Sequence, residues 1–591
     1  AAPLAIIAAS VFSEDEEFYL SRSLPTIEYT LSRSGYRWAT DLVPGGYNKT
    51  LETLRLNPFN SQFNTSYYEG LHRLLGGLNP WLSSIALPGD TLRRTKGYST
   101  QVLSWVQAIS AYTLTGDEKW KRLATSTADR YIDLQIYKNS SQPVGLMAFY
   151  NTNVYAPWWD LIDLYELTKD EKYLKAAQYG ASNTIAGIRS FPAVTENLQT
   201  IHPGNRFDGN TNLWWKGKEK YRLGFPRVAN DAKEKQVSEW LVSPVGLGFE
   251  QPSTYFLRTK GKQVRPVFMS NWAPHLLRLY QYTHKPIYET YARNGVIGRF
   301  TNYPGYYATG YTDITLSPDF PYKGPDVSSI YYHHIPPHLA FTWDYLVSEA
   351  IERSNGNIYF PFCKQEGFVW FTNRIYGNEK GKIFGDSKAK LWTKRGLVQV
   401  DNPTINYLTA VSDKYFWVIL SGESEQEESL TIRLDEAAGL VGQGDIVQYT
   451  EKGKTMKINR TGNTVRVSVP GKGFRALAFP LAEPRKENRY PVLKNGMKVV
   501  DMGEPFGKVF LFRIRSPFGW DSVYGFAETA PARDKEMSVS VECNGKSCRV
   551  ASYPFEWSFY KLGMDEKAVV KVTVSSKGQT DKTKEIILNS K

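Results

Sequence analysis

A chain of 591 residues is too long for one hydrophobic core, so roughly two to four domains are expected. With 41% hydrophobic and 22% charged residues, and no apolar run approaching the ~18 residues of a membrane span, the sequence excludes a membrane-spanning helix. The formal net charge of +13 favours an anionic partner, but the dispersed basic residues argue against a nucleic-acid-binding arm and fit a cleft for an acidic polymer or a solvated surface.

The N-terminal residues PLAIIAASVF lack the basic leader of a signal peptide. They are followed at once by a capping-box pattern, Ser13 to Glu16, which starts a new helix. We therefore expect the chain to begin inside a helical domain, with a signal sequence and a further N-terminal domain missing upstream.

Apolar residues recur at helical spacing through much of the first 355 residues. Between successive helices one turn pattern repeats. Thr115-Gly-Asp, with Tyr112 before it and Trp120 after it, is echoed around Thr168 and more faintly around Thr283. Such a repeat predicts an array or closed ring of helical hairpins. The predicted helices are 14–33, 98–115, 117–137, 155–168, 170–190, 267–282, 285–299 and 337–354.

After residue 356 the pattern changes to short β-branched or alternating runs separated by Gly, Asn, Lys and Asp. Residues 356–482 are predicted to form an antiparallel β-sandwich, 483–491 a polar linker, and 492–591 a smaller β-domain. In the last part, Cys543 and Cys548 flank an Asn-Gly turn, where a hairpin disulfide is sterically possible.

The repeated Thr-Gly-Asp turn, together with helical hairpins followed by β-domains, resembles the (α/α) toroid polysaccharide lyases that carry C-terminal antiparallel β-sandwich domains. The rhamnosyl-glucuronate lyases are one such type. The toroid part of the resemblance covers roughly residues 1–355. It implies a secreted or periplasmic enzyme that cleaves an acidic polysaccharide or oligosaccharide by β-elimination, in a cleft at one end of the ring.

Most of the candidate acid and base groups lie in a Tyr-rich stretch, residues 301–346, whose first part reads as an extended loop that ends at Pro336 and Pro337, where a helix begins; His275 lies at the start of an earlier predicted helix. Imidazole and phenol groups can move protons near neutral pH. We assign His334 or His275 as the base and Tyr311 or Tyr332 as the acid. The alternative is that these rings only cap and fill the starts of helices.

Other polar and aromatic residues in the predicted loops are candidates for binding the substrate. Asn153, Asn271 and Arg299 are assigned to neutralise the uronate carboxylate, because donors placed at developing negative charge stabilise it. The alternative for the tryptophans is packing between hairpins. The further substrate-binding candidates are Trp158, Trp214, Trp215, Arg222, His333 and His338.

Two rival functions keep the same fold. An inverting glycoside hydrolase needs two carboxyl groups ~6.5–9.5 Å apart. Glu250 is its best candidate acid, and a noncatalytic glycan-binding protein would use the aromatic residues alone. The available carboxylates are Asp160, Glu239, Glu250, Asp313 and Asp326.

No cofactor is predicted, because the sequence has neither a phosphate-binding loop nor a dinucleotide-binding fingerprint. Zinc held by His333, His334, His338 and Asp326 is disfavoured, since adjacent histidines rarely bind one ion and no H-E-x-x-H pattern is present. The sequence leaves open a structural calcium ion bound by loop carboxylates.

Overall fold

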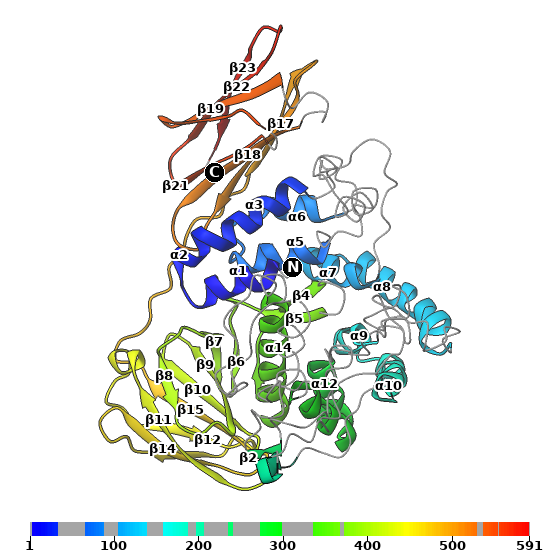
Figure 1. Ribbon diagram of the computed structural model, residues 1–591, viewed down its shortest axis with the longest axis vertical. Helices are drawn as coiled ribbons and strands as arrows, with labels where there is room; N and C mark the ends of the chain where they lie inside the picture. Colours follow the sequence, from blue (N-terminus) through cyan, green and yellow to red (C-terminus); the bar gives the residue numbers. More distant parts are fainter. Residues whose placement is uncertain are drawn as a thin grey trace.

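The protein, seen in a computed structural model, has its helices in the N-terminal part and its strands mainly in the C-terminal part (Figure 1). This confirms the predicted fold class of helices followed by antiparallel sheets. The structure describes residues 3–33, 65–87, 105–138, 158–186, 195, 197–201, 203–205, 234–239, 272–297, 335–366, 372–528, 536–552 and 555–589.

The helices end close to the predicted positions, whereas the predicted starts at 98, 155 and 267 lie outside the described residues; α5 and α6 had no predicted counterpart. A short antiparallel pair, β1 (Leu198–Ile201) and β2 (Lys235–Ser238), lies among the helices in sequence. The helices are α1 (Pro3–Phe12), α2 (Glu16–Phe18), a π-helical turn (Tyr19–Ser23), α3 (Leu24–Arg33), α5 (Thr65–Leu74), α6 (Trp81–Ala86), α7 (Trp105–Thr115), α8 (Glu118–Tyr131, continued to Ile136), α9 (Asp160–Thr168), α10 (Glu171–Ala186), α12 (Ala273–Thr283), 286–297 and α14 (Ile335–Arg353).

The repeated turns have one geometry. The hydroxyl of Thr115 donates to the carbonyl of Ala111 at 2.7 Å and accepts from the backbone N–H of Asp117 at 3.2 Å. The residue after each threonine has positive φ, at Gly116, Lys169 and His284, which ends the first helix of the hairpin. The hydrogen bonds that close this helical hairpin therefore lie within the seven residues from Ala111 to Asp117.

These hairpins close into a ring. Going round it, α1 packs on α5, α5 on α7, and α7 on α8, whose extension meets α10 of the next hairpin. The α9–α10 hairpin adjoins α12, α12 packs on α14, and α14 returns to α1. A core that runs through successive hairpins fills the contacts, with Trp158, Leu164, Leu276 and Phe341 among its buried members. Because every hairpin buries its apolar face on its neighbours, the stability of each hairpin depends on the rest of the ring.

The strands after α14 form an antiparallel sandwich and one separate hairpin. Within the described residues, an eight-stranded sheet has the order β13-β12-β15-β10-β9-β7-β6-β3, and a three-stranded sheet the order β14-β11-β8. The strands are β3 (Ile358–Tyr359), β4 (Phe362–Glu366), β5 (Thr372–Tyr376), β6 (Gly381–Ile383), β7 (Asp386–Leu391), β8 (Val398–Val400), β9 (Ile405–Val411), β10 (Tyr415–Gly422), β11 (Glu428–Leu434), β12 (Ile446–Tyr449), β13 (Thr455–Ile458), β14 (Thr464–Val469) and β15 (Phe474–Pro480).

Strand β10 joins the sandwich to the ring. Phe416, Val418 and Leu420 on one face belong to the core between the two sheets. Trp417 and Ile419 on the other face belong to the core that α14 shares with the eight-stranded sheet. A strand buried on both faces reads as a continuous apolar run, as this one does.

The C-terminal strands make two further antiparallel sheets, in the orders β16-β17-β18-β21 and β20-β19-β22-β23, with a shared core between them. The outer face of the first sheet packs on helices near the N-terminus, through residues such as Phe512 and Tyr524. Cys543 and Cys548 are both free thiols, so the hairpin disulfide is absent from the structure. The strands are β16 (Met497–Gly503), β17 (Gly507–Arg515), β18 (Asp521–Glu528), β19 (Met537–Cys543), β20 (Lys546–Val550), β21 (Glu556–Leu562), β22 (Ala568–Ser576) and β23 (Lys582–Leu588).

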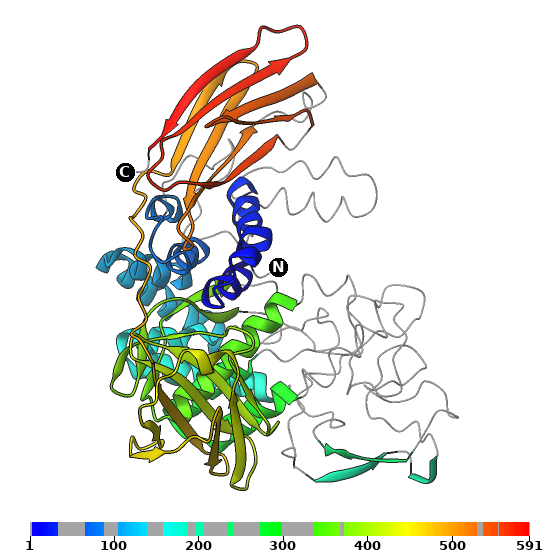
Figure 2. The same cartoon turned by 90° about the vertical axis from the view of Figure 1, so that its left-hand side faces the viewer.

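The parts follow one another along the molecule. In Figure 2 the C-terminal strands lie at one end, the N-terminal helices in the middle, and the sandwich of residues 358–480 towards the other end. None of the helices among the described residues is long and apolar enough to cross a membrane.

Candidate functional site

The β4–β5 hairpin packs mainly on helices of the ring, while Tyr376 at its end also belongs to the core of the eight-stranded sheet. β4 contacts α5, while β5 contacts α14 and α1. The sequence pattern alone grouped these residues with the sandwich. The hairpin instead brings two cationic side chains, Lys364 and Arg374, to the helices.

Those two side chains meet a row of carboxylates on α9. Lys364 forms ion pairs with Asp160 and, at 2.9 Å, with Asp163. The guanidinium of Arg374 bonds to Asp163 and Glu166, both at 2.5 Å. All five side chains are largely buried, so each charge depends on its partners rather than on water.

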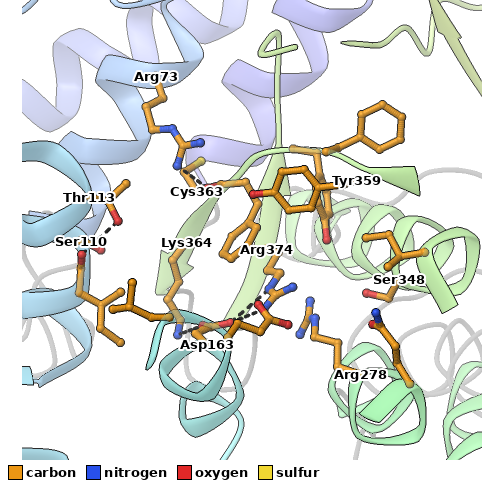
Figure 3. Close-up of a pocket in the computed structure, with 18 of the residues that line it drawn as sticks. Arg73, Ser110, Thr113, Asp163, Arg278, Ser348, Tyr359, Cys363, Lys364 and Arg374 are labelled. Carbon is orange, nitrogen blue, oxygen red and sulfur yellow. Dashed lines mark hydrogen bonds and ion pairs between the residues drawn. The ribbon is translucent and has the colours of Figure 1, made fainter. Parts of the chain in front are cut away.

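Beside this network lies a cavity of about 490 Å³, here called the ring pocket. It is bordered by α5, α7, α9, α12, α14 and the β3–β5 segment. Figure 3 shows Lys364 and Arg374 both reaching Asp163, with Arg73 away from them towards the α5 side. The polar and charged lining residues are Glu69, Arg73, Ser110, Thr113, Asp163, Glu166, Lys169, Arg278, Gln281, Tyr282, Ser348, Tyr359, Lys364, Arg374 and Tyr376.

Two carboxyl groups of the ring pocket have different environments. Burial raises the pKa of Glu69 from 4.5 to about 7, although Arg73, whose guanidinium donates to it at 2.9 Å, acts in the opposite direction. Glu166 accepts hydrogen bonds from Arg374 at 2.5 Å and from the Tyr282 hydroxyl at 2.8 Å. One carboxyl can thus give a proton near neutral pH, while the other is held as a hydrogen-bond acceptor.

A second cluster lies where α9 and α12 begin. The imidazole of His275 stacks on Trp159, with ring centroids 5.5 Å apart, and meets Trp158 edge-on. Arg278 lies 2.6 Å from His275 Nδ1. A guanidinium can only donate, so Nδ1 must accept, and a neutral His275 then carries its proton on Nε2. A neutral His275 is therefore arranged as a donor at Nε2, and the base role assigned to it stays a prediction.

Asp344 on α14 connects the two clusters. Its carboxylate is fully buried and accepts from Arg278, from the backbone N–H of Arg374 at 3.0 Å, and from Asn373 at 3.3 Å. Burial opposes ionisation, yet the nearby guanidiniums of Arg278 and Arg374 lower the pKa of Asp344 below its ordinary value. Asp344 is thus an ionised anchor that holds Arg278 between His275 and the ring pocket.

The described residues include few of the predicted site residues. Trp158 is 0% exposed, donates its indole N–H to Thr184 at 2.8 Å, and packs where a Cβ on Gly180 would come within 2.5 Å. With no open face, this indole serves packing, as the alternative interpretation had it. His338 lies in α14, and the structure describes its backbone but not its side chain. Those outside the described residues are Asn153, Trp214, Trp215, Arg222, Asn271, Arg299, Tyr311, Tyr332, His333 and His334.

Of the carboxylates considered for hydrolysis, the structure describes Asp160 and Glu239, which have different partners. Asp160 belongs to the Lys364 network, whereas Glu239 accepts from the backbone N–H of Thr195 at 2.8 Å beside the β1–β2 pair. Glu250, Asp313 and Asp326 lie outside the described residues. The predicted candidates are therefore not brought together by the part of the chain that can be seen.

The ring-pocket carboxylates Glu69, Asp163 and Glu166 were not among the predicted site residues, although their neighbour Asp160 was named as an available carboxylate. Asp160, Asp163 and Glu166 recur every third residue in a helix that the sequence did predict, so a shared acidic face could have been noticed. Glu69 gave no such signal, because α5 was not predicted. In the described parts of the chain, no three His, Cys, Asp or Glu side chains are grouped in a way that could hold a metal ion.

No protein-family model matches the chain, and no curated protein sequence matches it. Solved structures are similar to it at low identity, and three of them follow. The GH30 endoxylanase from Clostridium papyrosolvens C71 is 11% identical, over 16% of this chain and only 25% of its own length, with a TM-score of 0.14. A protein described as a glycoside hydrolase is 12% identical, over 99% of this chain and 88% of its own, with a TM-score of 0.29. A GH127 β-arabinofuranosidase is 10% identical, over 99% of this chain and 94% of its own length, with a TM-score of 0.22. Backbones this different do not superpose, so the fold described above rests on the protein's own contacts.

Proposed function

We propose that this protein is a carbohydrate-active enzyme that cleaves an acidic polysaccharide or oligosaccharide, with the ring pocket as its site. The pocket is lined by the cations Arg73, Lys169, Arg278, Lys364 and Arg374, against the carboxyl groups of Glu69, Asp163 and Glu166. Within the described residues, Arg73, Arg278, Lys364 and Arg374 already pair with carboxylates, and Lys169 is the lining cation without an ion pair. Lys169 and the chain's net charge of +13 suit a carboxylated sugar. Such polymers lie outside the cell, so a secreted or periplasmic location is part of the proposal.

Hydrolysis is the reaction that the described residues favour. The observation that carries it is a buried carboxyl, Glu69, with a pKa of about 7 in the same cavity as Glu166. In this mechanism Glu69 gives its proton to the bridging oxygen as the glycosidic bond breaks. Glu166 takes a proton from the water that attacks the anomeric carbon, and the two products are a free reducing end and an alcohol.

β-Elimination is the second candidate, and the geometry of His275 favours it. A donor at Nε2 suits a residue that binds a uronate carboxylate, the role already assigned to the adjoining Asn271. His334 would then remove the proton at C5, and Tyr311 or Tyr332 would protonate the departing oxygen at C4. The product carries a new double bond between C4 and C5 and absorbs in the ultraviolet.

A screen of acidic polysaccharides, followed for both reducing ends and ultraviolet absorbance, tests the proposal. Reducing ends without the absorbance support hydrolysis, and the two signals rising together support elimination. Turnover of neither kind on any acidic polymer overturns the enzymatic proposal.

The variant Glu69→Gln keeps the shape of the side chain and removes its proton. For hydrolysis we expect kcat to fall on the order of 10²-fold or more. The wild-type rate should also decline as the pH rises through about 7, where Glu69 loses its proton. Glu118→Gln, at an exposed glutamate of α8, is the matched control. Hydrolysis at the wild-type rate by Glu69→Gln would remove Glu69 from the mechanism.

A further inference from the structure

A second cavity, here called the junction pocket, lies away from the ring pocket and shares none of its lining residues. Its volume is about 500 Å³. Its walls come from parts far apart in sequence: the turn after α1, β7, the end of β9, the segment 485–490, and residues 517–518. The helices, the sandwich and the C-terminal strands therefore meet around one hollow. Its polar and charged lining residues are Glu14, Glu16, Asn378, Lys380, Lys388, Lys390, Ser412, Asp413, Arg485, Lys486, Glu487, Asn488 and Tyr490.

The carboxylates of the junction pocket already have cationic partners. Lys380 pairs with Glu487 at 2.9 Å, Lys388 with Asp413 at 2.8 Å, and Arg485 with Glu14. The fourth, Glu16, lies 3.3 Å from Lys561, which is outside the pocket lining.

Two cations are left over. Across the described residues, neither Lys390 nor Lys486 has a carboxylate within ion-pair distance, so the pocket has positive charge to spare.

Lys390 is the more confined of these two lysines. Its ammonium donates to Asn378 at 2.6 Å, which uses one of its three N–H donors. Burial lowers its pKa, and the neighbouring cation Arg485 acts in the same direction against the opposing effect of Glu14. A bound anion would supply the missing counter-charge and accept the remaining donors.

The rest of the lining suits a sugar rather than a bare ion. Tyr490 and Phe518 contribute aromatic surface, and Asn378, Asn488 and Ser412 contribute amide and hydroxyl groups. Tyr490 packs so closely on Gly519, which has a φ of +88°, that a Cβ there would lie 2.9 Å from its ring. This contact fixes the orientation of the phenol.

We propose that the junction pocket binds one or two uronate-containing sugar units, with the sugar carboxylate on Lys390 and Lys486 and Tyr490 against the sugar ring. The volume of about 500 Å³ matches a ligand of that size. This goes beyond the proposed function, because the junction pocket would hold an acidic glycan without cleaving it. Its ligand class is independent of whether the ring pocket hydrolyses or eliminates.

Hydrogen–deuterium exchange of the full chain tests the proposal, with a glucuronate-containing disaccharide as the probe. The disaccharide should protect residues 485–490 from exchange in the wild type. In Lys390→Gln, about tenfold more disaccharide should be needed for the same protection, since a charged hydrogen bond to the sugar is lost. Lys486→Gln, at an exposed position, is a second variant in case Lys390→Gln fails to fold. Lys452→Gln, an exposed lysine of the β12–β13 turn, is the control and should behave as the wild type.

The other arms of the experiment separate the sources of any protection. A neutral disaccharide that protects the segment equally would overturn the role of the lysines, and sulfate that protects equally would show an anion site without sugar recognition. Absence of protection by the uronate would also overturn the proposal. Glu69→Gln should show the same protection as the wild type, so failure of the ring pocket as an active site leaves this test unaffected.

Discussion

Glu28 of α3 provides a test of how the helices hold the C-terminal strands. Its side chain is 5% exposed and accepts a hydrogen bond from the hydroxyl of Tyr560 on β21 at 3.1 Å. Burial raises the pKa of Glu28 from 4.5 to about 8, although hydrogen bonds from Ser558 and Tyr560 act in the opposite direction. This carboxyl is therefore protonated in the folded protein at neutral pH.

The sign of the effect follows from the raised pKa. The folded state holds the proton of Glu28 more tightly than the unfolded state does. The resulting contribution of Glu28 to the free energy of unfolding is therefore complete below pH 4.5 and is lost as the pH rises through about 8. The difference between 4.5 and about 8, at about 1.4 kcal/mol per pKa unit, gives an upper limit of about 5 kcal/mol. The free energy of unfolding should fall by up to that amount across this pH range.

Glu28→Gln removes the titration while keeping an oxygen that can accept from Tyr560. We expect the variant to be more stable than the wild type at pH 9 and to differ less at pH 5. Urea unfolding followed by tryptophan fluorescence between pH 5 and 9 measures this, since Trp520 is buried in the turn before β18 and Trp557 is buried in β21. Other buried carboxyls contribute to both proteins equally, so the difference between them isolates Glu28.

Glu17→Gln is the matched control, because Glu17 is an exposed glutamate of the neighbouring helix α2. It makes the same chemical substitution without changing a buried group. If the stability of Glu28→Gln runs parallel to that of the wild type across the whole pH range, Glu28 does not titrate in this range and the reasoning is wrong.

Two further substitutions test packing and charge burial. Asp521→Asn should lower the free energy of unfolding by about 3–5 kcal/mol in urea denaturation, because it leaves the fully buried Arg513 and Arg515 without their shared carboxylate; a loss below about 1 kcal/mol would contradict this. Gly180→Ala should cost about 1–3 kcal/mol and lower the melting temperature, because the new Cβ would lie 2.5 Å from the Cβ of the enclosed Trp158. An unchanged or raised melting temperature would show that the helices move apart freely.

The sequence by itself determined the local structure. The turn at Thr115 is closed by hydrogen bonds within the nine residues from Ala111 to Lys119, so its pattern predicts a helical hairpin wherever it recurs. Strand β10 likewise shows its burial directly as an unbroken apolar run. These features depend on neighbours along the chain, and the predicted order of helices then antiparallel strands followed from them.

Only the tertiary structure decided which charges meet. Arg374 reaches Asp163 across 211 residues, and the ring must close before the β4–β5 hairpin can place it there. The raised pKa of Glu69 comes from burial within that closed ring, and the cation excess of the junction pocket comes from three separate parts of the chain meeting at one place. Ion pairs between residues far apart in the sequence, and the burial they depend on, leave no periodic pattern in the sequence. The sequence pattern therefore predicted the architecture, whereas the ring pocket and the junction pocket were found only in the structure.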